Sequence, residues 1–270
     1  MLLAVFISSL ASASEKPQRI VSLSLCTDEL VIALAQKDHI AAVTYLAQDD
    51  RYSRYAKEAE PLRTHHNQVE EIIGFNPDLI VGLDFEVGKT SALLKRLGYR
   101  IHQFPSPTRL VEVDAVLKSM GQLLREEKKA EQLSAEFHEQ LNTAKREIAP
   151  SEEARVLVYG PNGYSAGSLS IKSDLLRFLG LRPLSDAIGQ TYDGILPVAS
   201  ALRFDPEWVI IEMESDTHSL AHRYLQHPAL AAWFSRPEKV NRQIRMPNKL
   251  WLCAGLGLGD AAKHLASAVR

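Results

Sequence analysis

Two histidines and several acidic residues near position 218 have a spacing that could bind a metal ion. His218 and His222 are four residues apart, so on a helix both side chains would lie on one face, close to Glu212, Glu214 and Asp216. Two exposed histidines on a solvated helix are the commoner explanation. The sequence has no G-x-S-x-G, no H-E-x-x-H and no Cys–His nucleophile signature. We therefore expect a protein that is not an enzyme, with a periplasmic metalloenzyme as the alternative from another class.

The two cysteines, Cys26 and Cys253, lie near opposite ends of the chain. An even number of cysteines suits a disulfide in an oxidising compartment. The bond also requires the two Cα atoms to come within about 7 Å, and a sequence does not reveal this distance. A disulfide and two buried thiols both remain open.

Polar and aromatic residues follow several runs that we expect to form buried β-strands. In parallel α/β sheets, ligands collect at the loops beyond the carboxyl ends of the strands. Aromatic rings in such loops suit a large, rigid and partly apolar ligand. The residues expected to bind it are Cys26, Thr27, Tyr45, Asp84, Phe85, Tyr164, Tyr192 and Trp251. The alternative is that these aromatic side chains only seal the loops.

The elements that must position these residues follow a repeated pattern. Residues 70–84 predict a helix, a stop at Asn76-Pro77 and a buried strand over Leu79–Leu83, because the residue before a proline avoids the α region. The same phrase recurs 129 residues later, where Pro206 corresponds to Pro77. A repeat at about half the chain length predicts two similarly built lobes. Near the N-terminus, Thr27 or Asp28 is expected to cap a helix over Glu29–Ala35.

Between the lobes, the sequence from Gly121 to Ile148 contains no proline and is dense in helix-forming residues. Its apolar residues recur at spacings of three and four, which predicts one amphipathic helix of roughly 40 Å. We expect two α/β lobes with parallel sheets, joined by this long helix, and a ligand cleft between them. The predicted divisions are an N-terminal lobe over residues 14–120, the linking helix over 121–150 and a C-terminal lobe over 151–270.

The N-terminus reads as an export signal. Leu2–Leu10 is apolar, and Ala11-Ser12-Ala13 has the small-x-small pattern of a signal-peptidase site, so residues 1–13 are expected to be a signal peptide. A buried N-terminal strand or helix is the alternative. The formal net charge of −2 gives no electrostatic reason to expect nucleic acid or an anionic membrane surface as a partner. We expect a periplasmic monomer.

Three segments carry a resemblance to a known family. They are Arg19-Ile20-Val21-Ser22-Leu23 followed by a capped helix, residues 69–81, and Leu93-Leu94-Lys95-Arg96-Leu97-Gly98-Tyr99. With them the chain resembles the class III periplasmic binding proteins, which deliver cobalamin, ferric siderophores or haem to ABC importers. The resemblance covers essentially the whole mature chain. It implies two Rossmann-like lobes with the ligand between them and little hinge motion.

The resemblance also implies partners and a ligand class. Members of the family present one glutamate per lobe to an inner-membrane ABC permease; Glu70 matches the first, whereas Ala199 stands at the second position. The haem binders usually carry a Tyr-Pro pair after the second strand, and Tyr45 is followed by Leu46, which disfavours haem. We expect a ferric siderophore, with cobalamin as the alternative. No cofactor of the protein's own is implied, since the metal, Fe(III) or Co, belongs to the ligand. An anionic chelate could meet Arg63, Lys172 or Lys249.

Overall fold

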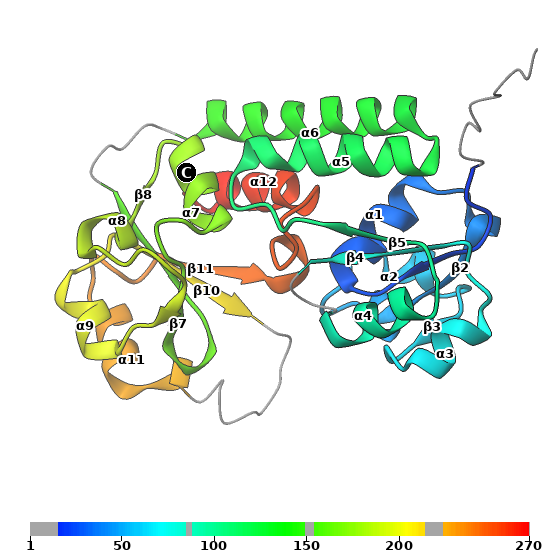
Figure 1. Cartoon of the computed structure of the whole chain (residues 1–270). Coiled ribbons are helices and arrows are strands. Elements are labelled where there is room, and N and C mark those ends of the chain that lie inside the picture. Colours follow the sequence, from blue (N-terminus) through cyan, green and yellow to red (C-terminus); the bar gives the residue numbers. More distant parts are fainter. Residues whose placement is uncertain (1–15, 85–87, 149–153, 214–223, 270) are drawn as a thin grey trace, which may run out of the picture.

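The computed structural model describes residues 16–84, 88–148, 154–213 and 224–269, which form two α/β lobes (Figure 1). In Figure 1 the N-terminal lobe, blue to cyan, lies on the right, and the C-terminal lobe lies on the left. Two helices, α5 and α6, run across the top and reach both lobes. The prediction of two α/β lobes is confirmed.

The N-terminal lobe has a five-stranded sheet in which every pairing is parallel, in the order β3-β2-β1-β4-β5. Strands β1, β2 and β4 are buried along their whole length, as expected of parallel strands covered on both faces. The strands are β1 (Ile20–Ser22), β2 (Ile40–Thr44), β3 (Thr64–His65), β4 (Leu79–Leu83) and β5 (Ile101–Phe104). The helices are α1 (Leu25–Leu34), α2 (Ala56–Ala59), α3 (Val69–Gly74) and α4 (Gly88–Arg96), with 3-10 turns at Lys37–His39 and Tyr45–Gln48.

The sheet of the C-terminal lobe has the order β11-β10-β6-β7-β9, with β8 also paired to β6. Its β6, β8, β10 and β11 pair in parallel, whereas β7 is antiparallel to both neighbours. The strands are β6 (Arg155–Tyr159), β7 (Tyr164–Ser165), β8 (Arg182–Pro183), β9 (Gly194–Ile195), β10 (Trp208–Met213) and β11 (Gln243–Pro247). The helices are α7 (Ile171–Phe178), α8 (Leu184–Ile188), α9 (Val198–Arg203), α11 (Pro228–Phe234) and α12 (Gly257–Val269), with 3-10 turns at Pro161–Gly163, Tyr224–Gln226 and Asn248–Leu250.

The two lobes share a local construction. In one, α3 leads into β4, and in the other, α9 leads into β10. Asn76 and Asp205 precede the two prolines and both adopt positive φ angles, 49° and 44°. Asparagine and aspartate tolerate this left-handed conformation better than most residues, so both helices end in the same turn. The repeat read from the sequence is therefore a repeat of backbone geometry.

The single helix expected over Gly121–Ile148 is wrong. Instead, α5 (Leu110–Leu124) and α6 (Glu127–Glu147) are separate helices. The break lies at Arg125, which has φ 57° and ψ 44° and forms a left-handed cap after α5. At ~1.5 Å per residue, the 21 residues of α6 span roughly 30 Å. The apolar stripe itself is correct, since Ala130, Phe137, Leu141 and Ala144 are buried.

The first helix also begins earlier than expected. The residue that caps α1 is Ser24, whose side chain accepts a hydrogen bond from the backbone N–H of Thr27. Neither Thr27 nor Asp28 is the cap, because both lie inside the helix with buried side chains. The helix therefore starts at Leu25, immediately after β1.

Candidate functional site

A cleft of about 840 Å³ lies between the two lobes. It is lined from the N-terminal side by Cys26, Leu83 and the segment Ser106–Arg109, which follows β5 and leads into α5. From the C-terminal side it is lined by Tyr164, residues 168–172 at the start of α7, Tyr192, Asp193 and Trp251. The volume lies within the range of about 300–1,000 Å³ that is usual for small-molecule sites.

The aromatic wall of this cleft belongs to the C-terminal lobe. Tyr192 is 75% exposed and Tyr164 is 40% exposed, although both are large apolar rings. Asp193 fixes this wall by accepting hydrogen bonds from the Tyr164 hydroxyl at 3.3 Å and from the Gly167 N–H at 2.8 Å. A Cβ atom at Gly167 would overlap the carbonyl group of Tyr192, so a glycine is needed for this close approach. Burial and the neighbouring Asp193 carboxylate raise the pKa of the Tyr164 phenol.

An ion pair lies at the inner end of the same wall. Lys172 in the first turn of α7 pairs with Glu212, which is near the carboxyl end of β10, and both side chains are largely buried. The Lys172 Nζ also lies 5.2 Å from the centroid of the Trp251 ring. Trp251 is only 1% exposed, so this cluster forms the base of the wall.

The N-terminal side of the cleft depends on a contact between α5 and α7. The backbone N–H of Leu110 donates to the Asp174 carboxylate of α7 at 2.8 Å, which brings the segment Ser106–Arg109 against the C-terminal lobe. Arg109 is exposed in this segment. Among the described residues, no hydrogen bond or ion pair engages its guanidinium. Arg177, also in the cleft, is bound by Asp186.

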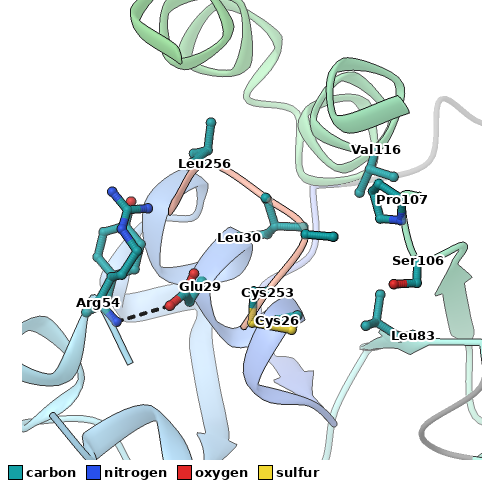
Figure 2. Close-up of a pocket in the computed structure, with 13 residues that line it drawn as sticks. Cys26, Glu29, Leu30, Arg54, Leu83, Ser106, Pro107, Val116, Cys253 and Leu256 are labelled. Carbon is teal, nitrogen blue, oxygen red and sulfur yellow. Dashed lines mark hydrogen bonds between the residues drawn. A yellow bond between two sulfur atoms is a disulfide. The ribbon is translucent and has the colours of Figure 1, made fainter. Parts of the chain in front are cut away.

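A disulfide joins the lobes at the inner end of the cleft (Figure 2). Cys26, at the start of α1, is bonded to Cys253, and their Cα atoms are 5.2 Å apart. Cys26 lines the main cleft and also a small adjoining chamber of about 30 Å³, where Glu29 and Arg54 lie. Of the two states left open by the sequence, the structure has the disulfide.

The cleft contains only part of the set of residues predicted from the sequence. Cys26, Tyr164, Tyr192 and Trp251 line it. Thr27 is fully buried and bonded to the hydroxyl groups of Ser22 and Ser24, at 2.8 Å and 3.0 Å. Tyr45 instead stacks on His66 with ring centroids 4.7 Å apart, and Asp84 does not line the cleft. Phe85 lies outside the described residues.

The predicted cations are mostly engaged elsewhere. Arg63 lies over the Phe75 ring, and Lys249 pairs with Asp50 at 2.8 Å. Sequence reasoning missed Arg109, Leu169 and Leu252, which line the cleft. The rule that ligands gather beyond the carboxyl ends of strands applies to Arg109, because its segment follows β5. Leu252 shares the position of Trp251 after β11, but the sequence criterion selects only polar and aromatic residues; Leu169 gave no such signal.

The possible metal site is not visible in the part of the chain that the structure describes. His218, His222, Glu214 and Asp216 lie outside that part, and Glu212 is held by Lys172. Among the described residues, no group of three or more His, Cys, Asp or Glu side chains could hold a metal ion. No described helix is both long enough and apolar enough to cross a membrane.

Comparison with known sequences gives one family and several relatives. The profile of a family described as periplasmic binding protein matches residues 20–233. A vitamin B12-binding protein of Vibrio parahaemolyticus is 26% identical over 155 residues, which are 57% of this chain and 55% of that protein. The ABC transporter substrate-binding lipoprotein YvrC of Bacillus subtilis is 24% identical over 174 residues, 61% of this chain and 54% of that protein. The chain thus aligns with about half the length of these curated relatives.

Solved structures share the fold along nearly the whole chain. A periplasmic haem-binding protein of Pseudomonas aeruginosa superimposes with a TM-score of 0.74 at 23% identity, covering 94% of this chain and 92% of that one. The periplasmic vitamin B12-binding protein BtuF of Vibrio cholerae gives a TM-score of 0.72 at 16% identity, covering 94% and 96%. At these identities the likeness concerns the fold alone.

Proposed function

The chain belongs to the periplasmic binding protein family, and we propose that it is the substrate-binding component of an ABC importer that captures a ferric siderophore. The family consists of solute-binding proteins, which agrees with the expectation that the chain is not an enzyme. We propose that the protein works in the periplasm and that the signal peptide predicted over residues 1–13 directs its export.

The observation that carries this proposal is the aromatic cleft between the lobes. Tyr192 and Tyr164 expose large ring surfaces to a space of about 840 Å³. Exposed rings that line a concave surface gain free energy when a ligand covers them, at roughly 25 cal/mol per Å² of apolar surface buried. A bulky, rigid chelate covers both rings at once.

One cation of the cleft, Arg109, is suited to an anionic group of a ligand. Arg109 offers its guanidinium to the cleft, whereas Lys172 pairs with Glu212 and Arg177 pairs with Asp186. Asp174 and Asp193 also line the cleft, but each already accepts a backbone hydrogen bond. A guanidinium binds carboxylate or catecholate oxygens through charge-assisted hydrogen bonds. Arg109 therefore supports a ferric siderophore that carries a carboxylate or catecholate group.

Cobalamin is the second candidate. The vitamin B12-binding proteins among the sequence relatives favour it, and a corrinoid ring is also bulky and partly apolar. Tyr45 stacks on His66 outside the cleft, so it is not positioned to coordinate a haem iron there.

Isothermal titration calorimetry with a panel of ligands tests the proposal. The panel contains ferric catecholate, hydroxamate and carboxylate siderophores, cobalamin and haemin. We expect 1:1 binding of a ferric siderophore with a Kd in the micromolar to nanomolar range, or about −8 to −12 kcal/mol. Cobalamin as the tightest ligand would favour the second candidate, and no binding of any member would contradict both.

A pair of tyrosine variants locates the binding site. Tyr192→Ala removes the most exposed ring of the cleft, so we expect the Kd to rise by about tenfold or more, equivalent to about 1.4 kcal/mol. Tyr45→Ala is the matched control, because Tyr45 is also an exposed tyrosine but lies outside the cleft. Equal effects of the two substitutions would contradict this placement of the ligand.

A further inference from the structure

We propose that the Cys26–Cys253 disulfide is a redox-sensitive lock that holds the two lobes together at the inner end of the cleft. Reduction would let the lobes separate and would weaken ligand binding; this second consequence rests on the proposed function. The lock is carried by one stretch of the C-terminal lobe, Lys249–Asp260, which we call the bridging segment.

The bridging segment contacts the N-terminal lobe at several points. Besides the disulfide, Lys249 pairs with Asp50 at 2.8 Å, and Asp260 pairs with Arg54 at 2.6 Å. Leu256 packs against the core clusters of both lobes. A Cβ atom at Gly257 would meet the Arg54 side chain at 2.9 Å, so the two lobes approach closely here. Figure 2 shows the disulfide, Leu256 and Arg54 on different sides of the same small chamber.

Among these contacts the disulfide is the strongest constraint. Asp50 is 81% exposed, and an ion pair open to solvent stabilises a structure only weakly because water and salt screen it. The Arg54–Asp260 pair is less exposed, at 18% and 35%, but it is not covalent and can separate. By contrast, a disulfide keeps its Cα atoms within about 6.8 Å. Since the two Cα atoms are now 5.2 Å apart, the oxidised lobes can separate at this point by only about 1.6 Å.

The rest of the connection leaves room for movement once this bond is cut. Within the described residues, the chain passes from one lobe to the other through α5 and α6, which lie on one side of the molecule (Figure 1). The disulfide lies at the cleft, where Val116 of α5 lines the same small chamber as Cys26 and Cys253. A covalent bond between the lobes restricts rotation of one lobe against the other more than the helical crossing does without it. Reduction removes this covalent attachment and leaves the two ion pairs and the packing of Leu256 as the contacts of the bridging segment with the N-terminal lobe.

The cleft gives a reductant access to the bond. Cys26 is partly exposed and lines the cleft, whereas Cys253 is 6% exposed. A thiolate of a dithiol reductant attacks the Cys26 Sγ, the S–S bond breaks, and Cys253 leaves as a thiolate that takes a proton from solvent. The second thiol of the reductant then closes its own disulfide and releases Cys26 as a thiol. The protein gains two electrons and two protons, and the dithiol loses them.

Small-angle X-ray scattering and hydrogen exchange test the lock without any ligand. The samples are the oxidised protein, the same protein after reduction with dithiothreitol, and the Cys26→Ser/Cys253→Ser variant. In both forms without the disulfide we expect a larger radius of gyration and at least about tenfold faster amide exchange in the bridging segment. Circular dichroism and the exchange of β1, β4, β6 and β10 identify any loss of fold, and the reduced wild-type protein provides the measurement if the variant does not fold.

Calorimetry then links the lock to binding. The panel member that binds the oxidised protein most tightly is titrated into the reduced protein, and we expect a several-fold higher Kd because the open cleft is less well preorganised. Unchanged scattering and unchanged exchange in the folded, reduced protein would contradict the proposal that the disulfide holds the lobes together. An unchanged Kd would contradict the proposal that reduction weakens ligand binding. Failure of the whole panel to bind the oxidised protein would contradict the proposed function, while scattering and exchange would still decide the lock.

Discussion

Asp28 and Glu29 are adjacent carboxyl groups that are almost fully buried at the start of α1. Burial raises the pKa of Asp28 to about 8, although Ser22 and Thr44 donate hydrogen bonds that favour the charged form. Burial likewise raises the pKa of Glu29 to about 7, opposed by the backbone N–H and the guanidinium of Arg54. Desolvation therefore outweighs hydrogen bonding at both residues. Glu29 also lines the small chamber beside the Cys26–Cys253 disulfide, whereas Asp28 is bonded to Thr44 in the core.

The raised pKa values predict that the protein loses stability as pH rises from about 4 to about 8. In this window the folded state binds more protons than the unfolded state, whose carboxyl groups titrate near their ordinary values of about 4. For each additional proton that the folded state binds, the free energy of unfolding falls by up to about 1.4 kcal/mol per pH unit. Urea denaturation at several pH values should show this decline, and Asp28→Asn should make it shallower. The control is the exposed Asp38→Asn, and equal slopes for Asp28→Asn and the wild type would contradict the explanation.

Single residues show where the sequence predicts a site and where it does not. Tyr164 and Trp251 follow strands that end at the cleft, and both line it; that they bind the ligand stays a prediction. The same rule failed for Tyr45, whose ring stacks on His66. It also failed for Thr27, whose hydroxyl group is hydrogen-bonded to the hydroxyl groups of Ser22 and Ser24. Side-chain direction depends on such neighbours, and a one-dimensional pattern does not contain them.

At the scale of elements, the turn between α5 and α6 was the main error of the sequence interpretation. Most residues from 121 to 148 favour a helix and none is proline, so neither composition nor periodicity marks a break at Arg125. Arg125 nevertheless adopts a left-handed conformation, in which glycine is the usual residue. The turn forms because it lets α6 pack back along α5, where Gly121 and Ala130 come into close approach. This tertiary contact outweighs the local helix preference.

The left-handed cap predicts that glycine stabilises this turn. Arg125→Gly removes the clash of the Cβ atom with the backbone, and we expect the free energy of unfolding to rise by about 1 kcal/mol relative to Arg125→Ala. The alanine variant is the right reference because it loses the same side-chain contacts but keeps the Cβ atom. Chemical denaturation of the two variants measures the difference. Equal stability of both would mean that the backbone at Arg125 is not strained.

At the scale of the whole molecule, the internal repeat predicted the architecture well. Two matched helix–turn–strand phrases indicated two lobes, and the structure repeats even their positive φ angles at Asn76 and Asp205. What the repeat did not contain is how the lobes meet. Three contacts depend on the relative placement of the lobes. The Cys26–Cys253 bond and the Arg54–Asp260 ion pair each join residues more than 200 positions apart, and Leu256 packs against the cores of both lobes. The division at residues 120 and 150 stays a prediction.

The outer surface of the N-terminal lobe carries the last prediction, which concerns docking to the permease. Glu70 is exposed in the first turn of α3, and among the described residues no hydrogen bond or ion pair engages its carboxylate. Its neighbour Glu71 is different, because it accepts a hydrogen bond from the His66 N–H at 2.7 Å and so holds the loop before the helix. Glu70 does not line the cleft. Its charge is thus free to bind a basic partner, as the resemblance to permease-docking glutamates implies.

We expect Glu70→Ala to leave the Kd for the ligand unchanged within about twofold and to slow ligand import several-fold, because a charge at the edge of an interface acts mainly on the association rate. Calorimetry measures the first quantity, and uptake into cells that carry the cognate permease measures the second.

Glu131→Ala is the matched control, since Glu131 is an exposed glutamate on α6, on the opposite side of the molecule from α3 (Figure 1). Weaker ligand binding in Glu70→Ala would place this residue in the binding site, and equal import by the two variants would exclude it from docking. Because the corresponding position in the C-terminal lobe is Ala199, the loss of Glu70 leaves no second glutamate at a matched position to compensate.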